Sequence, residues 1–413
     1  MKTASWILRG LLIAVVLTPA AFTEDLAGTA RQAAAGDAAA VKALRDAGPS
    51  GMEALLKLAG AEPAVSKQPS FDATLDAVCA QKDCAASHLY WYTDLTAAQE
   101  AARKSGKPIL SLRLLGRLDE ELSCANSRFF RAVLYSNERV SQELRDRFVL
   151  HWQSERPVPK VTIDFGDGRR LVGTVTGNSI HYILDSKGRL VEALPGLYGP
   201  AAFLRHLGEA ADEARAVAVL PDGAYRGRLV EYHRERIAIQ NQELAADLRK
   251  AGLPADEAPG IWQSPETRKT AAASERTISK SAGEMGLLRA VLPDLDGLKA
   301  GSPKLAALAN FHAEDARLDE ASRRHLMTTR GNLVKDNLWP MRRFENRIAE
   351  DTVRNEYLLH KEIHLWFVAA RQVPDLASFN DRVYTELFLT PASDPWLGLG
   401  PSELYSALTP AGE

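Results

Sequence analysis

One cysteine stands apart from the other two in this sequence and is the first side chain that could act as a nucleophile. Cys124 lies in the segment LSCANSRFF, where a helix is expected to begin. Backbone N–H groups at a helix N-terminus stabilise a thiolate and lower its pKa. Ser127 can donate a hydrogen bond to that thiolate, and Arg128 adds a positive charge nearby. Such a thiolate can form a mixed disulfide or a sulfenic acid; the alternative is a packed, unreactive Cys124.

A second group of side chains has the spacing of metal ligands. In RNEYLLHKEIHLWF, Glu356, His360 and His364 recur every four residues and therefore share one face of a helix. Paired histidines at this spacing bind zinc and other divalent metals, with nitrogen or oxygen ligands completing a tetrahedron. His312 or Glu345 could supply a fourth ligand from elsewhere in the chain. The alternative is a half-buried helix whose histidines are hydrogen-bonded to acidic side chains.

No other cofactor is indicated by the sequence. There is no Gly-rich phosphate loop and no Gly-x-Ser-x-Gly nucleophile elbow. The chain carries 51 Lys plus Arg against 53 Asp plus Glu, so it lacks the basic excess that nucleic-acid binding requires. The expected partners are therefore a protein or a thiol substrate, and the oligomeric state is not indicated.

The first 22 residues have the three-part layout of a secretory signal peptide. Lys2 and Arg9 give a positive start, residues 11–17 are apolar, and two alanines precede the expected cleavage site. The apolar run is shorter than the roughly 20 residues of a membrane span. We expect a periplasmic or secreted protein with no transmembrane segment in the mature chain; the alternative is a retained N-terminal anchor.

The remaining two cysteines suit an oxidising compartment. Cys79 and Cys84 lie five residues apart in VCAQKDCAA and predict a disulfide that closes a small loop. A small loop constrains little chain entropy, so the bond should contribute modestly to stability.

The chain between the signal and the C-terminus divides by composition into helical and mixed regions. Ala- and Leu-rich periodicity predicts a helical hairpin at 25–62, followed by a linker at 63–87 that carries Cys79 and Cys84. Charged, helix-forming sequence predicts an all-helical C-terminal domain at 225–413, with a loop at 253–285.

The region between these parts alternates helix and strand patterns. Helices are expected at 91–105, 127–147 and 201–215. Strands are expected at 109–115, 148–152, 180–184 and 189–193, with a loop between the second and third strands. A helix between the first two strands indicates a parallel pair, and the turn DSKG indicates an antiparallel hairpin.

This order, with KPIL opening a buried strand and a cysteine at the start of the next helix, resembles the thioredoxin-like superfamily over about residues 88–215. The segment IHYILDSKGRLVEALPG is similar to the last hairpin of that fold. The resemblance implies an α/β domain with a mixed sheet and flanking helices, and it places Cys124 at the active-site cysteine. The pattern here is Cys-x-x-Ser, and Ser179 stands where the family has a cis-proline.

These observations lead to two expectations of function. The first is an exported thioredoxin-like protein with a monothiol redox or thiol-handling role through Cys124. The alternative is a non-catalytic secreted or envelope protein, in which a degenerate thioredoxin-like domain and the helical domain form an interaction scaffold. Fold resemblance alone does not choose between them.

Overall fold

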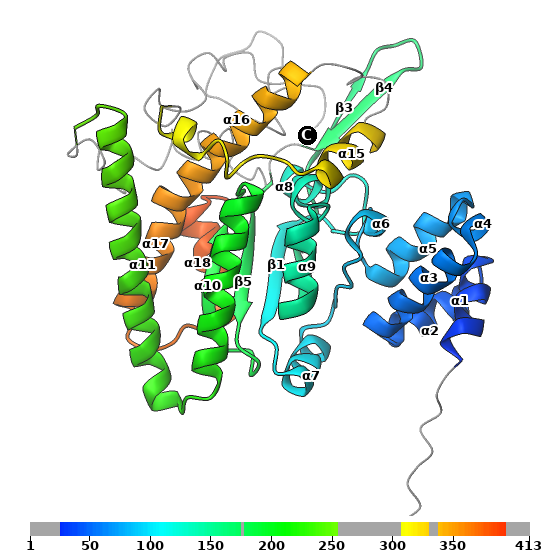
Figure 1. Cartoon of the computed structure of the whole chain (residues 1–413), viewed down its shortest axis with the longest axis horizontal. Coiled ribbons are helices and arrows are strands. Elements are labelled where there is room, and N and C mark those ends of the chain that lie inside the picture. Colours follow the sequence, from blue (N-terminus) through cyan, green and yellow to red (C-terminus); the bar gives the residue numbers. More distant parts are fainter. Residues whose placement is uncertain (1–24, 175–176, 255–306, 330–337, 394–413) are drawn as a thin grey trace, which may run out of the picture.

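The computed structural model describes residues 25–174, 177–254, 307–329 and 338–393 (Figure 1). The expected signal peptide, almost all of the loop expected at 253–285 and the last 20 residues lie outside these described ranges. Within the described ranges, no helix combines the length and the apolar character needed to cross a membrane.

The centre of the molecule is a mixed sheet of four strands in the order β2-β1-β5-β6. The strands are β1 (Ile109–Leu115), β2 (Val149–Arg156), β5 (Ser179–Leu184) and β6 (Leu190–Pro195). β1 pairs in parallel with β2 and antiparallel with β5, and β5 pairs antiparallel with β6. The mixed α/β class and the expected strands are therefore confirmed.

Local chemistry explains why these strands form and turn where they do. Every residue of β1 is buried, as its apolar run predicts for a strand covered on both faces. The β5–β6 turn is closed by Asp185, whose Oδ1 accepts hydrogen bonds from the backbone N–H groups of Lys187 and Arg189 at 2.9 Å. Gly188 adopts φ +86° in this turn, a conformation that favours glycine.

Helices cover both faces of the sheet. The connection from β1 to β2 comprises α8 (Ala125–Phe129), the π-helix η1 (Phe130–Leu134) and α9 (Glu138–Arg147), and α10 (Pro200–Ala218) follows β6. In β5, His181 contacts Phe203 of α10, whereas the next residue, Tyr182, contacts Phe379 of α18 (Leu376–Arg382). Successive strand residues point to opposite faces, so α10 and α18 lie on opposite sides of the sheet.

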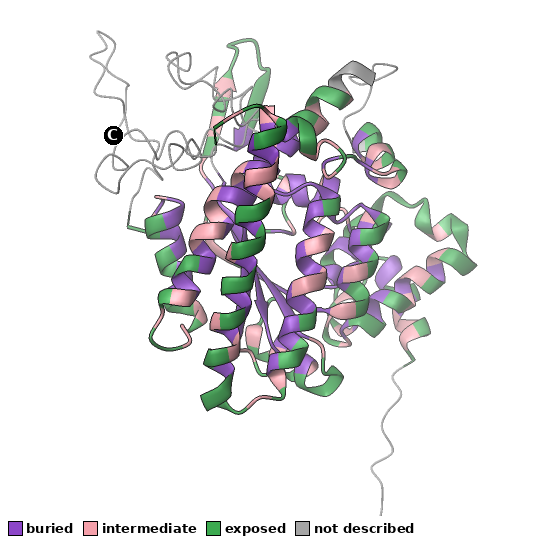
Figure 2. Ribbon diagram, turned by 60° about the vertical axis from the view of Figure 1, so that its left-hand side comes forward, coloured by how far each residue is buried: buried purple, intermediate pink, exposed green. Residues whose placement is uncertain are grey.

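The C-terminal helices pack against the sheet and share its hydrophobic core. One buried core has members from Leu89 to Phe388. In Figure 2 the buried residues lie on the central sheet and on the helices around it. It includes residues of α11 (Asp222–Lys250), α15 (Glu320–Thr329), α16 (Leu338–Arg354), the π-helix η6 (Asn355–His360), α17 (Lys361–Ala369) and the π-helix η7 (Val383–Leu387). The helical region expected from 225 onward is thus part of one core with the sheet.

The N-terminal helices form a second, smaller core beside the sheet (Figure 1). They lie next to β2, because the indole N–H of Trp152 in that strand donates to the Ala80 carbonyl at 2.8 Å. Their bounds are α1 (Leu26–Ala34), α2 (Ala38–Asp46), α3 (Pro49–Ala61), α4 (Pro63–Ser66), α5 (Pro69–Cys79) and α6 (Cys84–Ser87). The predicted hairpin at 25–62 contains three helices, because its first half is divided into α1 and α2. The division lies at Gly36, which adopts φ +96°, and at Asp37, which caps α2.

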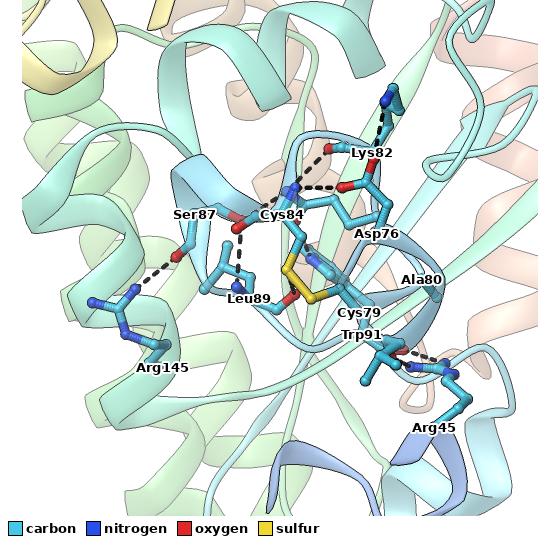
Figure 3. Close-up of a disulfide and its surroundings, with 12 residues drawn as sticks. Arg45, Asp76, Cys79, Ala80, Lys82, Cys84, Ser87, Leu89, Trp91 and Arg145 are labelled. Carbon is cyan, nitrogen blue, oxygen red and sulfur yellow. Dashed lines mark hydrogen bonds and ion pairs between the residues drawn. A yellow bond between two sulfur atoms is a disulfide. The ribbon is translucent and has the colours of Figure 1, made fainter. Parts of the chain in front are cut away.

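The prediction of a linker at 63–87 is wrong, because this segment is largely helical. Phe71 and Leu75 of α5 are buried in the N-terminal core, and burial of this apolar face stabilises a helix that its Pro- and Ser-rich start conceals. The predicted disulfide joins Cys79 and Cys84 (Figure 3). Asp76 accepts a 2.8 Å hydrogen bond from the Cys84 backbone N–H and so holds the loop closed.

A two-stranded hairpin that the sequence analysis does not predict projects from the sheet after β2 (Figure 1). It consists of β3 (Lys160–Asp164) and β4 (Arg170–Thr174), paired antiparallel. Phe165, Leu171 and Val172 are exposed on it.

A buried histidine pairs β1 with β2 and makes the stability of the fold sensitive to acid. His151 shares a 2.8 Å hydrogen bond between its Nδ1 and the Ser111 hydroxyl, and burial, assisted by the nearby Arg113, lowers its pKa to about 4. Between about pH 6.5 and pH 4 the unfolded chain therefore binds a proton that the folded chain does not. The free energy of unfolding should fall by roughly 3 kcal/mol over that window and be intact above it.

The His151→Gln variant isolates this effect. We expect it to be about 1 kcal/mol less stable than the wild type at pH 7, because the hydrogen bond to Ser111 is weakened. Its urea-unfolding free energy should lose roughly 3 kcal/mol less than the wild type between pH 7 and pH 4. Parallel pH profiles for the two proteins would contradict the prediction.

Candidate metal centre

A buried carboxylate and two buried histidines meet between β6 and the C-terminal helices. Glu192 of β6, His360 at the end of η6 and His364 of α17 each offer a ligand atom, and these atoms all lie within 4.8 Å of one another. The structure thus brings together the two histidines that the sequence analysis singled out. Their acidic partner is Glu192 rather than Glu356.

The π-helix η6 sets where these histidines point. It spans Asn355–His360, between the α-helices α16 and α17. Asn355 is anchored because its side-chain amide donates to the Leu197 carbonyl, at the loop after β6. The wider turn of a π-helix changes the facing of residues four apart, and such segments occur frequently at functional sites.

The carboxylate of Glu192 is held from several sides. The neighbouring residue in β6, Ala193, donates its backbone N–H to Oε1 at 2.8 Å, and the hydroxyl of Tyr232 from α11 donates to Oε2 at 3.1 Å. His360 Nε2 lies 3.2 Å from Oε1, and His364 Nδ1 lies 3.8 Å from Oε2. Glu192 pairs with Ile183 in the sheet and therefore points to the face that α10 covers.

The electrostatics of Glu192, His360 and His364 favour a bound cation. Burial opposes the ionisation of Glu192, but the attraction of the imidazoles of His364 and His360 holds its pKa well below the ordinary value. Burial, however, also lowers the pKa of both imidazoles. A proton is therefore a costly source of positive charge here, and an uncompensated buried carboxylate is strongly unfavourable. A divalent ion bound by the three side chains supplies that charge directly.

The ring nitrogens of His360 give an independent indication of a missing partner. His360 is 1% exposed. Among the described residues its Nδ1 has no hydrogen-bond partner, and its Nε2 has only the Glu192 carboxylate, 3.2 Å away. A buried, unsatisfied polar atom costs about 1–3 kcal/mol. The Nε2 of His364 is also buried without a hydrogen bond in this part of the chain.

Glu356, the third residue of the predicted ligand set, lies beside the centre in a different pairing. Its carboxylate is 3.6 Å from His206 Nε2 and 3.5 Å from the Arg205 guanidinium, both on α10. Burial opposes its ionisation, but His206 and then Arg205 lower the pKa of Glu356 to about 2. Glu356 is thus a buried anion that already has a positive neighbour.

The two distant residues considered as a fourth ligand have other partners. His312 bridges Asp247 at 2.7 Å and Asp315 at 3.2 Å. Glu345 accepts hydrogen bonds from the Leu318 backbone N–H and from the Arg323 guanidinium, each at 3.1 Å.

Cys124 stands at the start of a helix, as predicted, but inside the protein. It caps α8, its sulfur accepts a 3.4 Å hydrogen bond from the Ser127 backbone N–H, and its side chain is 0% exposed. A Cβ placed on Gly177 would lie 2.8 Å from the Cys124 Cβ, so the chain before β5 packs directly against the thiol.

The two residues expected to assist Cys124 act differently from the prediction. The Ser127 hydroxyl is buried and has no hydrogen-bond partner within the described ranges, while Arg128 donates to the Thr174 hydroxyl at 3.0 Å. Ser179 accepts a 2.7 Å hydrogen bond from the Asn126 side chain, and the described chain contains no cis peptide bond.

Sequence reasoning missed Glu192, although a signal was present. The residue is the single charge in the apolar strand LVEALP, where the register places it among buried side chains. A charge in a fully buried strand needs a partner, so this position could have been flagged.

No protein-family model matches this chain, and neither a curated protein nor a solved structure is significantly similar to it.

Proposed function

We propose that this protein binds one divalent metal ion through Glu192, His360 and His364. The observation that carries the proposal is His360, a buried imidazole whose Nε2 lies 3.2 Å from a buried carboxylate and whose Nδ1 makes no hydrogen bond within the described structure. Coordination would satisfy Nε2 and neutralise the carboxylate in one step.

Zinc suits this donor set best among the common metals. Two imidazoles and one carboxylate are borderline ligands that zinc binds at about 2.0–2.2 Å, whereas calcium and magnesium prefer sites built from oxygen atoms. The surrounding hydrogen bonds also fit, because the Tyr232 hydroxyl and the Ala193 N–H orient the carboxylate from outside the centre.

The ion would connect parts of the chain that are far apart in sequence. Glu192 belongs to the edge strand of the sheet, and both histidines belong to the helices that cover that edge. Metal binding would therefore stabilise the folded state, because the unfolded chain does not present these ligands together.

We further propose that the sheet and its flanking helices form a thioredoxin-like domain. The order β2-β1-β5-β6, the parallel β1–β2 pair and the position of Cys124 at the N-terminus of α8 support this assignment. Because the thiol is buried, the geometry favours a scaffold role for the domain over monothiol redox chemistry. The Cys79–Cys84 disulfide supports export to an oxidising compartment.

Elemental analysis of the purified protein after incubation with zinc and dialysis tests the metal proposal. We expect one zinc ion per chain in the wild type. The variants Glu192→Gln, His360→Ala and His364→Ala should each lose at least about 100-fold in zinc affinity, because each removes a direct ligand. The control His312→Gln changes a histidine in a separate carboxylate network and should bind zinc as the wild type does.

Two results would overturn the proposal. One is the absence of stoichiometric zinc, iron, cobalt or manganese in folded wild-type protein incubated with each ion. The other is wild-type affinity in the Glu192→Gln and His360→Ala variants.

A further inference from the structure

A fourth side chain faces the candidate metal centre from α11. His233 is 0% exposed, and its Nδ1 lies 2.9 Å from Nδ1 of His364. Its ring stacks on Phe367 with the centroids 4.0 Å apart and the planes 13° apart. This stacking fixes the plane of the imidazole, so the direction of Nδ1 is set before any ion binds.

The hydrogen bond on the far side of the ring determines the tautomer of His233. Its Nε2 lies 3.1 Å from the backbone carbonyl oxygen of Val191, the residue before Glu192. A carbonyl oxygen only accepts hydrogen bonds, so Nε2 must carry the proton. In the neutral ring Nδ1 then holds a bare lone pair that is directed at His364. A histidine ligand typically donates its other N–H to a backbone carbonyl in this way.

His364 cannot satisfy both of its own nitrogens in this arrangement. If its Nδ1 carries the proton and donates to His233, its Nε2 is left as a bare, buried acceptor, and that atom has no hydrogen bond within the described residues. If instead Nε2 carries the proton, two bare Nδ1 lone pairs face each other. A cation bound by the two Nδ1 atoms removes the repulsion between these lone pairs, while the Nε2–H of His364 stays a buried donor without a hydrogen bond among the described residues.

Three separations around this point are close to the edges of one coordination shell. The separations are 2.9 Å between the Nδ1 atoms of His233 and His364, 3.2 Å between His360 Nε2 and Glu192 Oε1, and 3.8 Å between His364 Nδ1 and Glu192 Oε2. Bonds of about 2.0–2.1 Å in a tetrahedron give ligand-to-ligand distances of about 3.3 Å. The three observed separations lie on both sides of this value. His233 is not among the residues whose ligand atoms all lie within 4.8 Å of one another, so its Nδ1 must move closer to Glu192 and His360 when the ion binds.

We propose that His233 is the fourth protein ligand of the metal ion, which gives a closed shell of three imidazoles and one carboxylate. This inference rests on the proposed function, because it requires that the centre binds a metal. A shell with four protein ligands leaves no position for an activated water, which is the property of structural rather than catalytic zinc sites. The ion would then fasten α11 to β6 and α17.

Cobalt(II) provides the test, since it occupies zinc sites and reports its ligands spectroscopically. In the NMR spectrum of the cobalt-loaded wild type, each ligand imidazole contributes one hyperfine-shifted N–H proton. We expect three such protons if His233 is a ligand. Only two hyperfine-shifted N–H protons would overturn the inference, while leaving the proposed metal site intact. A protein that binds no cobalt would instead show that the proposed function is wrong.

Two variants and a control extend the test to affinity. His233→Gln should weaken cobalt binding at least about 100-fold. His233→Cys should add an intense thiolate-to-cobalt charge-transfer band in the near ultraviolet, because only a coordinated sulfur produces it. The control His206→Gln changes a buried histidine whose ring lies 5.1 Å from that of His360, and it should keep wild-type affinity. Unchanged affinity and no new band in the two folded His233 variants would exclude coordination by residue 233.

Discussion

In the presence of zinc, the Glu192→Gln variant is expected to be less stable than the wild type, and in the presence of a chelator this difference is expected to shrink. With the ion at 1,000 times its dissociation constant, binding adds about 4 kcal/mol to the free energy of unfolding of the wild type. The variant should gain little of this, because the amide is a poor ligand and supplies no negative charge.

The difference that remains without a metal follows from the electrostatics of the carboxylate. Burial opposes the ionisation of Glu192, but the imidazoles of His364 and His360 hold its pKa well below the ordinary value. An ionised carboxylate with a lowered pKa stabilises the folded state, so metal-depleted Glu192→Gln should still be less stable than metal-depleted wild type, by less than it is with zinc. Denaturant unfolding of both proteins with zinc and with a chelator measures all four values. An equal difference between the two proteins with zinc and with the chelator would contradict the prediction.

Replacing Gly51 by alanine should disrupt the packing of the N-terminal helices. Gly51 lies in α3 where this helix crosses α2, and an added Cβ would lie 1.9 Å from the backbone oxygen of Leu44. Backbone atoms cannot move aside as a flexible side chain can, so the two helices must separate. We expect a loss of about 3 kcal/mol or more in the stability of this helical group.

Gly60 provides a matched control within the same helix. It is exposed, and a Cβ added there meets nothing within 4 Å. Gly60→Ala should therefore stabilise the protein by about 0.5–1 kcal/mol, through helix propensity alone. Thermal unfolding followed by circular dichroism would compare the two variants, and an equal effect of both substitutions would show that the helix contact does not limit stability.

The sheet was predictable because its signals are local. The apolar run at β1 predicts a buried strand, and Asp185 and Gly188 predict a turn, in each case from a few consecutive residues. The break between α1 and α2 also had a local signal, Gly36 followed by Asp37, but the Ala-rich periodicity on both sides outweighed it. The projecting β3–β4 hairpin was missed because β3 alternates between exposed and half-buried residues and contributes little to the core.

The candidate site was only half predictable, because its ligands are not neighbours in sequence. The four-residue spacing of His360 and His364 was visible, and a straight α-helix would also have placed Glu356 on the same face. The π-helical turn at Asn355–His360 changes which side chains share a face, and no sequence pattern predicted this turn. Glu192 and His233 reach the centre from a strand and from another helix, and only tertiary packing shows that they meet.

The shared core also has a consequence for the order of events during synthesis. The last strand of the sheet ends at Pro195, whereas the helices that cover its edge arrive only with Asn355–His360 and Lys361–Ala369. A nascent chain must therefore carry a finished sheet with one edge and one acidic side chain uncovered until nearly all of it has been made. Contacts of such long sequence separation form slowly. Truncation from the C-terminal end would leave the growing chain permanently at this aggregation-prone stage.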